Sequence, residues 1–220
     1  LKLLSQISGK KISEKRKKER GRFMDAMVDG HKYNGEAKAA IYGEPDFVYS
    51  TVRLCAENGI MPVITATGSK CLSFQVLLKE EIEKVADIYL TDDYQILDEV
   101  DFGTIEELVR QLDVNILIGN SDGRRIAEKL GLDLIRRSFP IHDRVGGQRL
   151  RTLGYEGALS FLDDISNAVL ARKTRTFRKV LYDKYFHEKK EYNGKMLKNN
   201  PVIKDFSGEN LWNQNEKKIG

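Results

Sequence analysis

The residues of this chain that are best suited to chemistry lie in short polar loops. The most reactive set is His142, Asp143 and Arg144, because a histidine beside a carboxylate can act as a base, a metal ligand or an oriented hydrogen-bonding pair. A structural alternative is equally open, in which Asp143 and Arg144 fix the loop and His142 is exposed. No nucleophile stands at a diagnostic spacing from this triplet, so we assign no catalytic residue.

Two further polar loops follow the first and second predicted strands. Glu44 and Asp46 follow the first, but the glycines of a GxGxxG fingerprint are missing there, so we expect no nucleotide site. We predict that Asp46 caps the next helix, with a ligand or interface role left open. The second loop holds Thr67, Ser69 and Cys71, whose hydroxyls and thiol suit an anion or a thiolate ligand, or form an ordinary loop.

The fourth predicted strand ends in Asn120, Ser121 and Asp122, and Ser121 or Asp122 is predicted to cap the helix that follows. Arg124 and Arg125 then stand in the first turn, where the helix dipole disfavours cations, which hints at an acidic partner or ligand. The candidate ligand or interface residues are therefore Glu44, Asp46, Thr67, Ser69, Cys71, Asn120, Ser121, His142, Asp143 and Arg144.

Alternating strands and helices must position these loops. Apolar runs predict five strands, at residues 37–42, 62–66, 88–90, 114–118 and 132–139. Helices are predicted at residues 13–29, 47–57, 73–85, 104–113 and 122–130 and from about 154, with Ser73 as one cap and a Thr104/Glu107 capping box as another. This order predicts an α/β fold, a Rossmann-like three-layer domain with a mostly parallel five-stranded sheet and helical N- and C-terminal extensions. The polar loops should then meet at the carboxyl edge of the sheet.

The boundaries that we expect are a basic helical segment at 1–36, the α/β domain at 37–171, and a basic helical and irregular extension at 172–220. In the extension, Phe177, Val180, Leu181 and Tyr185 predict that the last helix continues or restarts. Residues 192–220 have a composition typical of disorder. Phe206, Leu211 and Trp212 within them are expected to dock on the domain or on a neighbouring chain.

Charge and cysteine content limit the classes of protein. Residues 10–22 hold eight Lys/Arg against two Glu, and residues 172–198 hold ten against three acids, so the α/β domain between them is net acidic. Because aromatic residues for base stacking are few, solvated helical faces are favoured over a nucleic-acid partner. No apolar run is long enough to cross a membrane, and we expect no signal peptide. Two unpatterned cysteines predict a cytoplasmic protein, with Cys55 in the core and no metal site.

At these loops the chain resembles the carboxyl-terminal third of the nitrogenase component 1 family. The matching segments, which cover about residues 13–171, are Glu19–Asp29 with His31–Tyr33, Tyr42–Phe47, Ile118–Gly123, Phe139–Arg144 and Gly154–Ala158. The Phe-Pro-Ile-His-Asp-Arg loop is similar to that of the β-type chains. In the α-type chains the corresponding loop carries a histidine that binds the cofactor, and alignment on the shared Asp places Pro140, not His142, at that position.

The resemblance implies a subunit that pairs with an α-like component 1 subunit and receives electrons from an ATP-dependent iron–sulfur reductase. The parent complex would hold iron–sulfur or metal–iron–sulfur clusters. Their bridging cysteines belong to an amino-terminal domain, so none is assigned to Cys55 or Cys71. This chain, which starts at Leu1, would be a piece of the longer subunit that shapes an interface, holds no cofactor, is inactive alone and is oligomeric.

Two alternatives stay open. One is a β-like scaffold subunit for iron–molybdenum cofactor biosynthesis, a binding platform rather than an enzyme. The other is a stand-alone α/β module that binds a small anion through Thr67, Ser69, Ser121 and Arg144.

Overall fold

A computed structural model describes residues 1–187, without the side chains of Thr176 and His187. Its sheet has five strands in the order β3-β2-β1-β4-β5, and all of its strand pairs are parallel. The strands are β1 (Lys38–Tyr42), β2 (Met61–Ala66), β3 (Gln95–Leu97), β4 (Ile116–Gly119) and β5 (Asp133–Arg136). The predicted Rossmann-like α/β fold is therefore confirmed.

The central strands are buried because helices cover both of their faces. β2 and β4 are buried along their whole length, as their nearly continuous apolar sequences predict. β1 lies between them, with Ile41 opposite Thr65 on one side and Ile118 on the other. This arrangement puts the switch in strand order between β1 and β4, at the centre of the sheet.

The predicted third strand at residues 88–90 is wrong. Those residues end helix α4 (Phe74–Tyr89), and Leu90 closes the helix in a left-handed conformation with φ 52°. Ile88 is 73% exposed, so its apolar side chain does not belong to the sheet. The third strand comes five residues later, where Ile96 pairs with Thr65 of β2.

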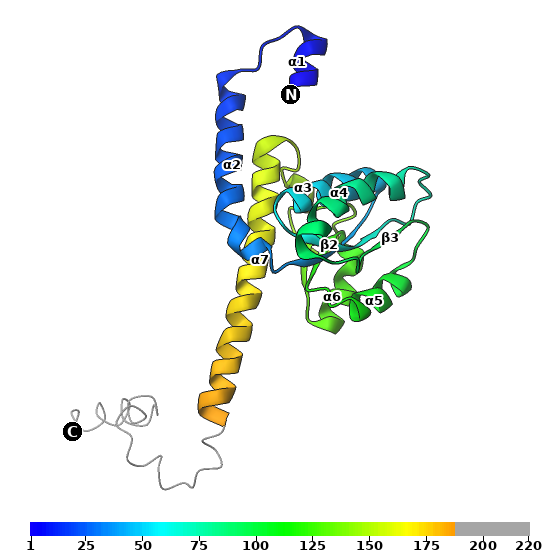
Figure 1. Cartoon of the computed structure of the whole chain (residues 1–220), viewed down its shortest axis with the longest axis vertical. Coiled ribbons are helices and arrows are strands. Elements are labelled where there is room, and N and C mark those ends of the chain that lie inside the picture. Colours follow the sequence, from blue (N-terminus) through cyan, green and yellow to red (C-terminus); the bar gives the residue numbers. More distant parts are fainter. Residues whose placement is uncertain (188–220) are drawn as a thin grey trace, which may run out of the picture. The chain divides into compact units, whose positions relative to one another are not determined.

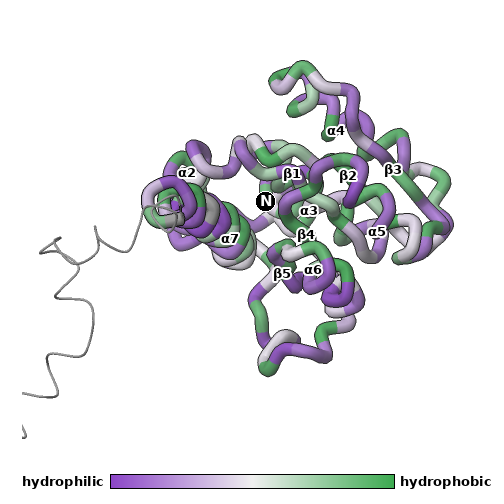
Figure 2. Tube along the Cα trace, turned by 90° about the horizontal axis from the view of Figure 1, so that it is seen from below, coloured by the Kyte–Doolittle hydropathy of each residue, from purple (hydrophilic) through white to green (hydrophobic). Residues whose placement is uncertain are grey.

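Two layers of helices enclose the sheet. Figure 1 shows α3 (Pro45–Glu57) and α4 on one face, and α5 (Phe102–Gln111) and α6 (Arg124–Leu130) on the other. Their apolar stripes face the strands, and Cys55 is fully buried in the core as predicted. Figure 2 shows hydrophobic and hydrophilic residues alternating along these helices.

Three of the predicted helix caps are wrong, because α3 and α5 begin earlier than expected and a 3-10 turn precedes α6. Glu44, not Asp46, stands at the N-cap of α3. The cap of α5 is Asp101, whose carboxylate accepts the Thr104 N–H at 2.8 Å, and not a Thr104/Glu107 box. Asn120 caps the 3-10 turn Ser121–Gly123 that precedes α6, and its side chain accepts the Asp122 N–H at 3.1 Å.

Ser73 does stand at the N-cap position of α4, but its side chain makes no capping hydrogen bond.

Two long helices lie side by side next to the sheet, α2 (Glu14–Asn34) and α7 (Gly154–Tyr182) (Figures 1 and 2). Arg22 of α2 pairs with Glu156 of α7, and the Ser166 hydroxyl donates to the Asn34 side chain at 2.8 Å. The inner face of α7 is buried and carries Phe161, Leu162 and Ile165. The remaining elements are α1 (Lys2–Ser8), the 3-10 turn Gly147–Arg149 and a π-helical turn at Asp183–His187.

Residues 1–172 form one compact unit, and a second unit begins at Lys173. Helix α7 continues past Leu170 to Tyr182, as the apolar stripe of Phe177, Val180 and Leu181 predicts. The docking predicted for Phe206, Leu211 and Trp212 lies outside the described residues. Over residues 1–187, every helix is too short or too polar to cross a membrane.

Candidate functional site at the carboxyl edge of the sheet

The polar loops after β1, β2, β4 and β5 lie on one rim, since all five strands run in the same direction. The Ser69 hydroxyl donates to the Glu44 carboxylate at 3.3 Å, which joins the loops after β2 and β1. The Ser121 N–H donates to the carbonyl of Pro140 at 3.0 Å, which joins the loops after β4 and β5.

The loop after β5 is held by an ion pair that the sequence did not reveal. Arg136, at the end of β5, donates from Nε to both carboxylate oxygens of Asp143 at 2.8 and 3.0 Å, and from Nη2 at 2.6 Å. Ser121 donates its hydroxyl to the same carboxylate, and its oxygen accepts the His142 N–H at 3.1 Å. The Arg136 guanidinium and the Ser121 hydroxyl therefore hold the pKa of Asp143 well below its usual range.

This network decides between the alternatives for the His142 triplet. The partner of Asp143 is Arg136, so the expected Asp143–Arg144 contact is not what fixes the loop. The carboxylate is 3% exposed and fully engaged, whereas His142 and Arg144 are exposed. In the described structure no hydrogen bond joins the side chains of His142 and Asp143, so the arrangement does not form a base and its orienting carboxylate.

Tyr42 closes the crevice in which ligands of this fold class bind. Tyr42 is 3% exposed, its ring packs against Gly119 of β4 and Gly123, and its hydroxyl donates to the Asn120 carbonyl at 2.9 Å. A Cβ added at Gly119 or at Gly123 would overlap this ring, so both glycines make room for tyrosine rather than for a phosphate. Burial raises the pKa of Tyr42, and Phe102 packs edge-on against it with 5.3 Å between ring centroids.

The hydroxyl groups proposed for an anion already have partners. Thr67 is 2% exposed, and its Oγ1 accepts the Ser69 N–H at 3.2 Å. The hydroxyls of Ser69 and Ser121 both donate to carboxylates, those of Glu44 and Asp143. An anion would have to displace these carboxylates, so the geometry disfavours the anion-binding module.

The two arginines that hinted at an acidic partner also have acidic partners within the chain. Arg124 pairs with Glu128 at 2.9 Å, and Arg125 pairs with Glu106 at 3.2 Å. Glu106 also binds Arg110 and Lys129, and these hydrogen bonds lower its pKa to about 2. Arg124 thus forms an ion pair within α6, and Arg125 links α6 to α5.

The two cysteines are chemically unlike each other. Cys55 is fully enclosed, and burial raises the pKa of its thiol to about 12. Cys71 is half-buried in the loop after β2, where its N–H faces the Asp98 carboxylate at 3.5 Å. Across residues 1–187, no three His, Cys, Asp or Glu side chains gather in a geometry that could hold a metal ion.

Beside the rim lies a groove of about 1040 Å³ between α2, α3 and the start of α7. Phe47, Phe161 and Leu54 form part of its lining, and Phe139 and Leu153 stand exposed at its mouth. Arg137 also lines this groove, and its side chain is 1% exposed.

The Arg137 guanidinium stacks on Phe161 at 5.3 Å and donates to the Ser160 carbonyl at 2.9 Å and to the Asp164 carboxylate. The sequence did not single out Tyr42, Arg136 or Arg137. Only their position in the sequence could have indicated a role at the site, since all three lie at or just after the end of a strand.

The family model described as nitrogenase component 1 type oxidoreductase matches residues 1–170. The chain belongs to this family. It is 37% identical over 167 residues to a nitrogenase molybdenum-iron protein beta chain of Methanothermobacter marburgensis, covering 76% of this chain and 35% of that protein.

Two further similarities agree with this assignment. A nitrogenase iron-molybdenum cofactor biosynthesis protein NifN of Rhodobacter capsulatus is 35% identical over 159 residues, which are 70% of this chain and 31% of that protein. A solved nitrogenase Cp1 chain superimposes with a TM-score of 0.71 at 29% identity, covering 79% of this chain and 37% of that chain.

This component 1 family chain thus spans about a third of the length of the relatives that it matches, and the β-like assignment is supported.

Proposed function

We propose that this chain acts as the carboxyl-terminal α/β domain of a β-type component 1 subunit and that it supplies interface rather than cluster ligands. The role is assigned to residues 37–171, with the rim loops as the contact surface. The subunit would pair with an α-like component 1 chain in an oxidoreductase that receives electrons from an ATP-dependent iron–sulfur reductase.

The observation that carries the proposal is the closed crevice at the sheet switch point. Tyr42 fills the place of a bound ligand, and Asp143 is locked by Arg136 and Ser121. What remains outside is a fixed loop with exposed side chains at His142, Arg144 and Val145, the last of them 95% exposed. A rigid loop of exposed polar and apolar side chains suits recognition of another protein.

The donor set of the described residues does not fit an iron–sulfur cluster. Such clusters are held by several thiolates, whereas Cys55 is enclosed with a raised thiol pKa and Cys71 stands by itself. The alignment that puts Pro140 in place of the α-type histidine points the same way. Clusters therefore belong to the parent complex in this proposal, and no step of chemistry is assigned to this chain.

A scaffold role in cofactor assembly is the second candidate, and the similarity to a NifN protein favours it. Both roles use the same interface. They differ in whether the parent complex turns over substrate with the reductase or hands a cluster to another protein.

The test is co-expression, without oxygen, of the full chain with the α-like component 1 chain of the same genome. We expect a complex in size-exclusion chromatography with light scattering, and less than one iron per chain in the component 1 domain when it is purified alone. The variant Arg144→Glu should weaken the complex, whereas the control Lys79→Glu on the far helix α4 should not. No complex, or stoichiometric iron in the isolated chain, would overturn the proposal.

A further inference from the structure

Helix α7 extends beyond the residues that the family model matches. The family model ends at residue 170, while the helix continues to Tyr182. In this extension Phe177 is 63% exposed, Val180 58% and Leu181 36%. Positions 177, 180 and 181 are neighbours on one side of a helix, so these side chains form an apolar strip in contact with water.

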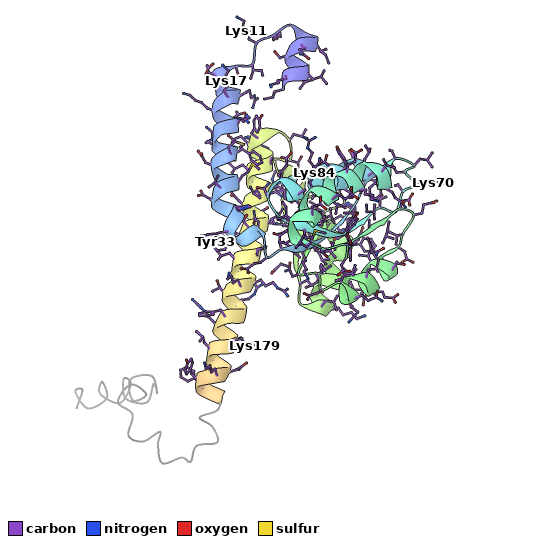
Figure 3. All side chains as sticks on the ribbon, in the orientation of Figure 1. Lys11, Lys17, Tyr33, Lys70, Lys84 and Lys179 are labelled. Atoms are coloured by element: carbon purple, nitrogen blue, oxygen red, sulfur yellow. The ribbon has the colours of Figure 1, made fainter. Side chains whose placement is uncertain are left out.

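Cations flank this strip. Arg178 and Lys179 follow Phe177 directly, and Figure 3 labels Lys179 on this part of α7. We call residues 177–181 the basic apolar strip. Because burial of a phenylalanine and two aliphatic side chains is favourable, a contiguous apolar strip left in water indicates a binding partner.

The groove between α2, α3 and α7 has the complementary character. Its floor is apolar, with Phe47, Leu54 and Phe161. Its mouth carries Glu44 and Asp46, both exposed carboxylates. In the described structure these two make hydrogen bonds to Ser69 and to the Phe47 N–H, but no ion pair.

We propose that the basic apolar strip of one copy of this chain binds in the groove of a second copy. The apolar side chains would enter between Phe47 and Leu54, and Arg178 and Lys179 would meet Glu44 and Asp46 at the mouth. Charge complementarity at the mouth selects this occupant. The three arginines that line the groove, Arg16, Arg53 and Arg137, are paired with Glu19, Glu57 and Asp164, which leaves the carboxylates of Glu44 and Asp46 for the cations of the strip. Glu44 and Asp46 also lie in the rim loops, so this contact shares residues with the surface proposed for the α-like subunit.

The two surfaces differ, so the contact is head-to-tail. A dimer formed in this way still has one free strip and one free groove, so association should continue past the dimer unless a ring closes. The carboxylates and cations at the mouth are exposed, so salt should weaken the contact.

Sedimentation equilibrium of the full chain tests the proposal with two matched variants. The strip variant is Phe177→Ser with Leu181→Ser. The groove variant is Leu153→Lys with Asp46→Lys, and Leu153 is 85% exposed, so its replacement leaves the core intact. The control is Ile88→Ser, which removes an equally exposed apolar side chain at the end of α4.

The wild type and the control should show an average mass above 25.1 kDa that rises with concentration, and each variant should weaken association about tenfold or more. In an equimolar mixture, the groove variant supplies an intact strip and the strip variant supplies an intact groove. The mixture should therefore form heterodimers and nothing larger. A monomeric wild type, variants that associate like the wild type, or a mixture that stays monomeric would each overturn the proposal. Circular dichroism of each variant confirms that it is folded.

Discussion

The Tyr42 hydroxyl lies against Gly123, close enough that no side chain larger than hydrogen fits at that glycine. The same hydroxyl donates to the Asn120 carbonyl at 2.9 Å. The sheet switch point, which holds a ligand in many proteins of this fold class, is filled here by a residue of the protein itself. A Gly-rich sequence at this turn therefore serves packing.

The first prediction follows from this contact. Gly123→Ala should destabilise the domain by about 1–3 kcal/mol, because the new methyl group overpacks against the tyrosine. In a Tyr42→Phe background the same substitution should cost less, since the atom nearest to Gly123 is gone. Urea unfolding of the four proteins of this cycle measures the coupling, and equal costs in both backgrounds would show that the contact is not as close as described.

The second prediction concerns the thiols. Cys71 should react with a thiol reagent within the dead time of a slow mixing experiment, whereas Cys55 should react at the rate of unfolding. The reason is that Cys55 is fully enclosed with its pKa raised to about 12, while Cys71 lies half-buried in a loop. Mass spectrometry of the labelled peptides distinguishes the two sites. Rapid modification of Cys55 in the native protein would contradict its place in the core.

The third prediction concerns pH. The folded-state pKa of Asp143 lies below its unfolded value, so its contribution to stability is complete above pH 4 and is lost as the pH falls further. Asp143→Asn should be less stable than the wild type at pH 7, and this difference should shrink below pH 4. Amide exchange in residues 139–144 should speed up at pH 7 in the same variant. A difference in stability that is constant from pH 7 to pH 3 would rule out this ion pair.

The fourth prediction concerns the attachment of α5 to α6. Glu106 binds Arg110, Arg125 and Lys129, and its pKa is lowered to about 2 from an ordinary value near 4.5. Glu106→Gln should lower the midpoint of thermal unfolding at pH 7 and remove the part of the acid sensitivity that lies between those two values. The matched control is Glu107→Gln, whose carboxylate is at the exposed side of the same helix and accepts from Gln111. Equal effects of both substitutions would contradict the account.

Periodicity in the sequence predicted most of the fold, because the strands β1, β2 and β4 are apolar along their length and the helices carry clear stripes. It failed at Ile88–Leu90, where an exposed helix end has the composition of a strand. It also misplaced the caps at Asp46 and Thr104, since Glu44 and Asp101 cap these helices two and three residues earlier.

The candidate site was predicted in part. Parallel strands alone place Glu44, Ser69, Ser121 and Asp143 on one rim, and this follows from the sequence. The partners of these residues do not. Arg136 binds Asp143 from seven positions away in the chain, and Tyr42 of β1 meets Gly123 in the turn after β4, so both contacts depend on the packed sheet.

The central claim is that the rim loops of this component 1 domain bind protein. Hydrogen–deuterium exchange of the full chain, with and without the α-like component 1 chain, tests it most directly. We predict that residues 43–46, 67–71, 119–123 and 139–144 become protected together, while α4 exchanges as before. Unchanged exchange in the rim within a formed complex, or protection confined to α4 and α5, would contradict the claim.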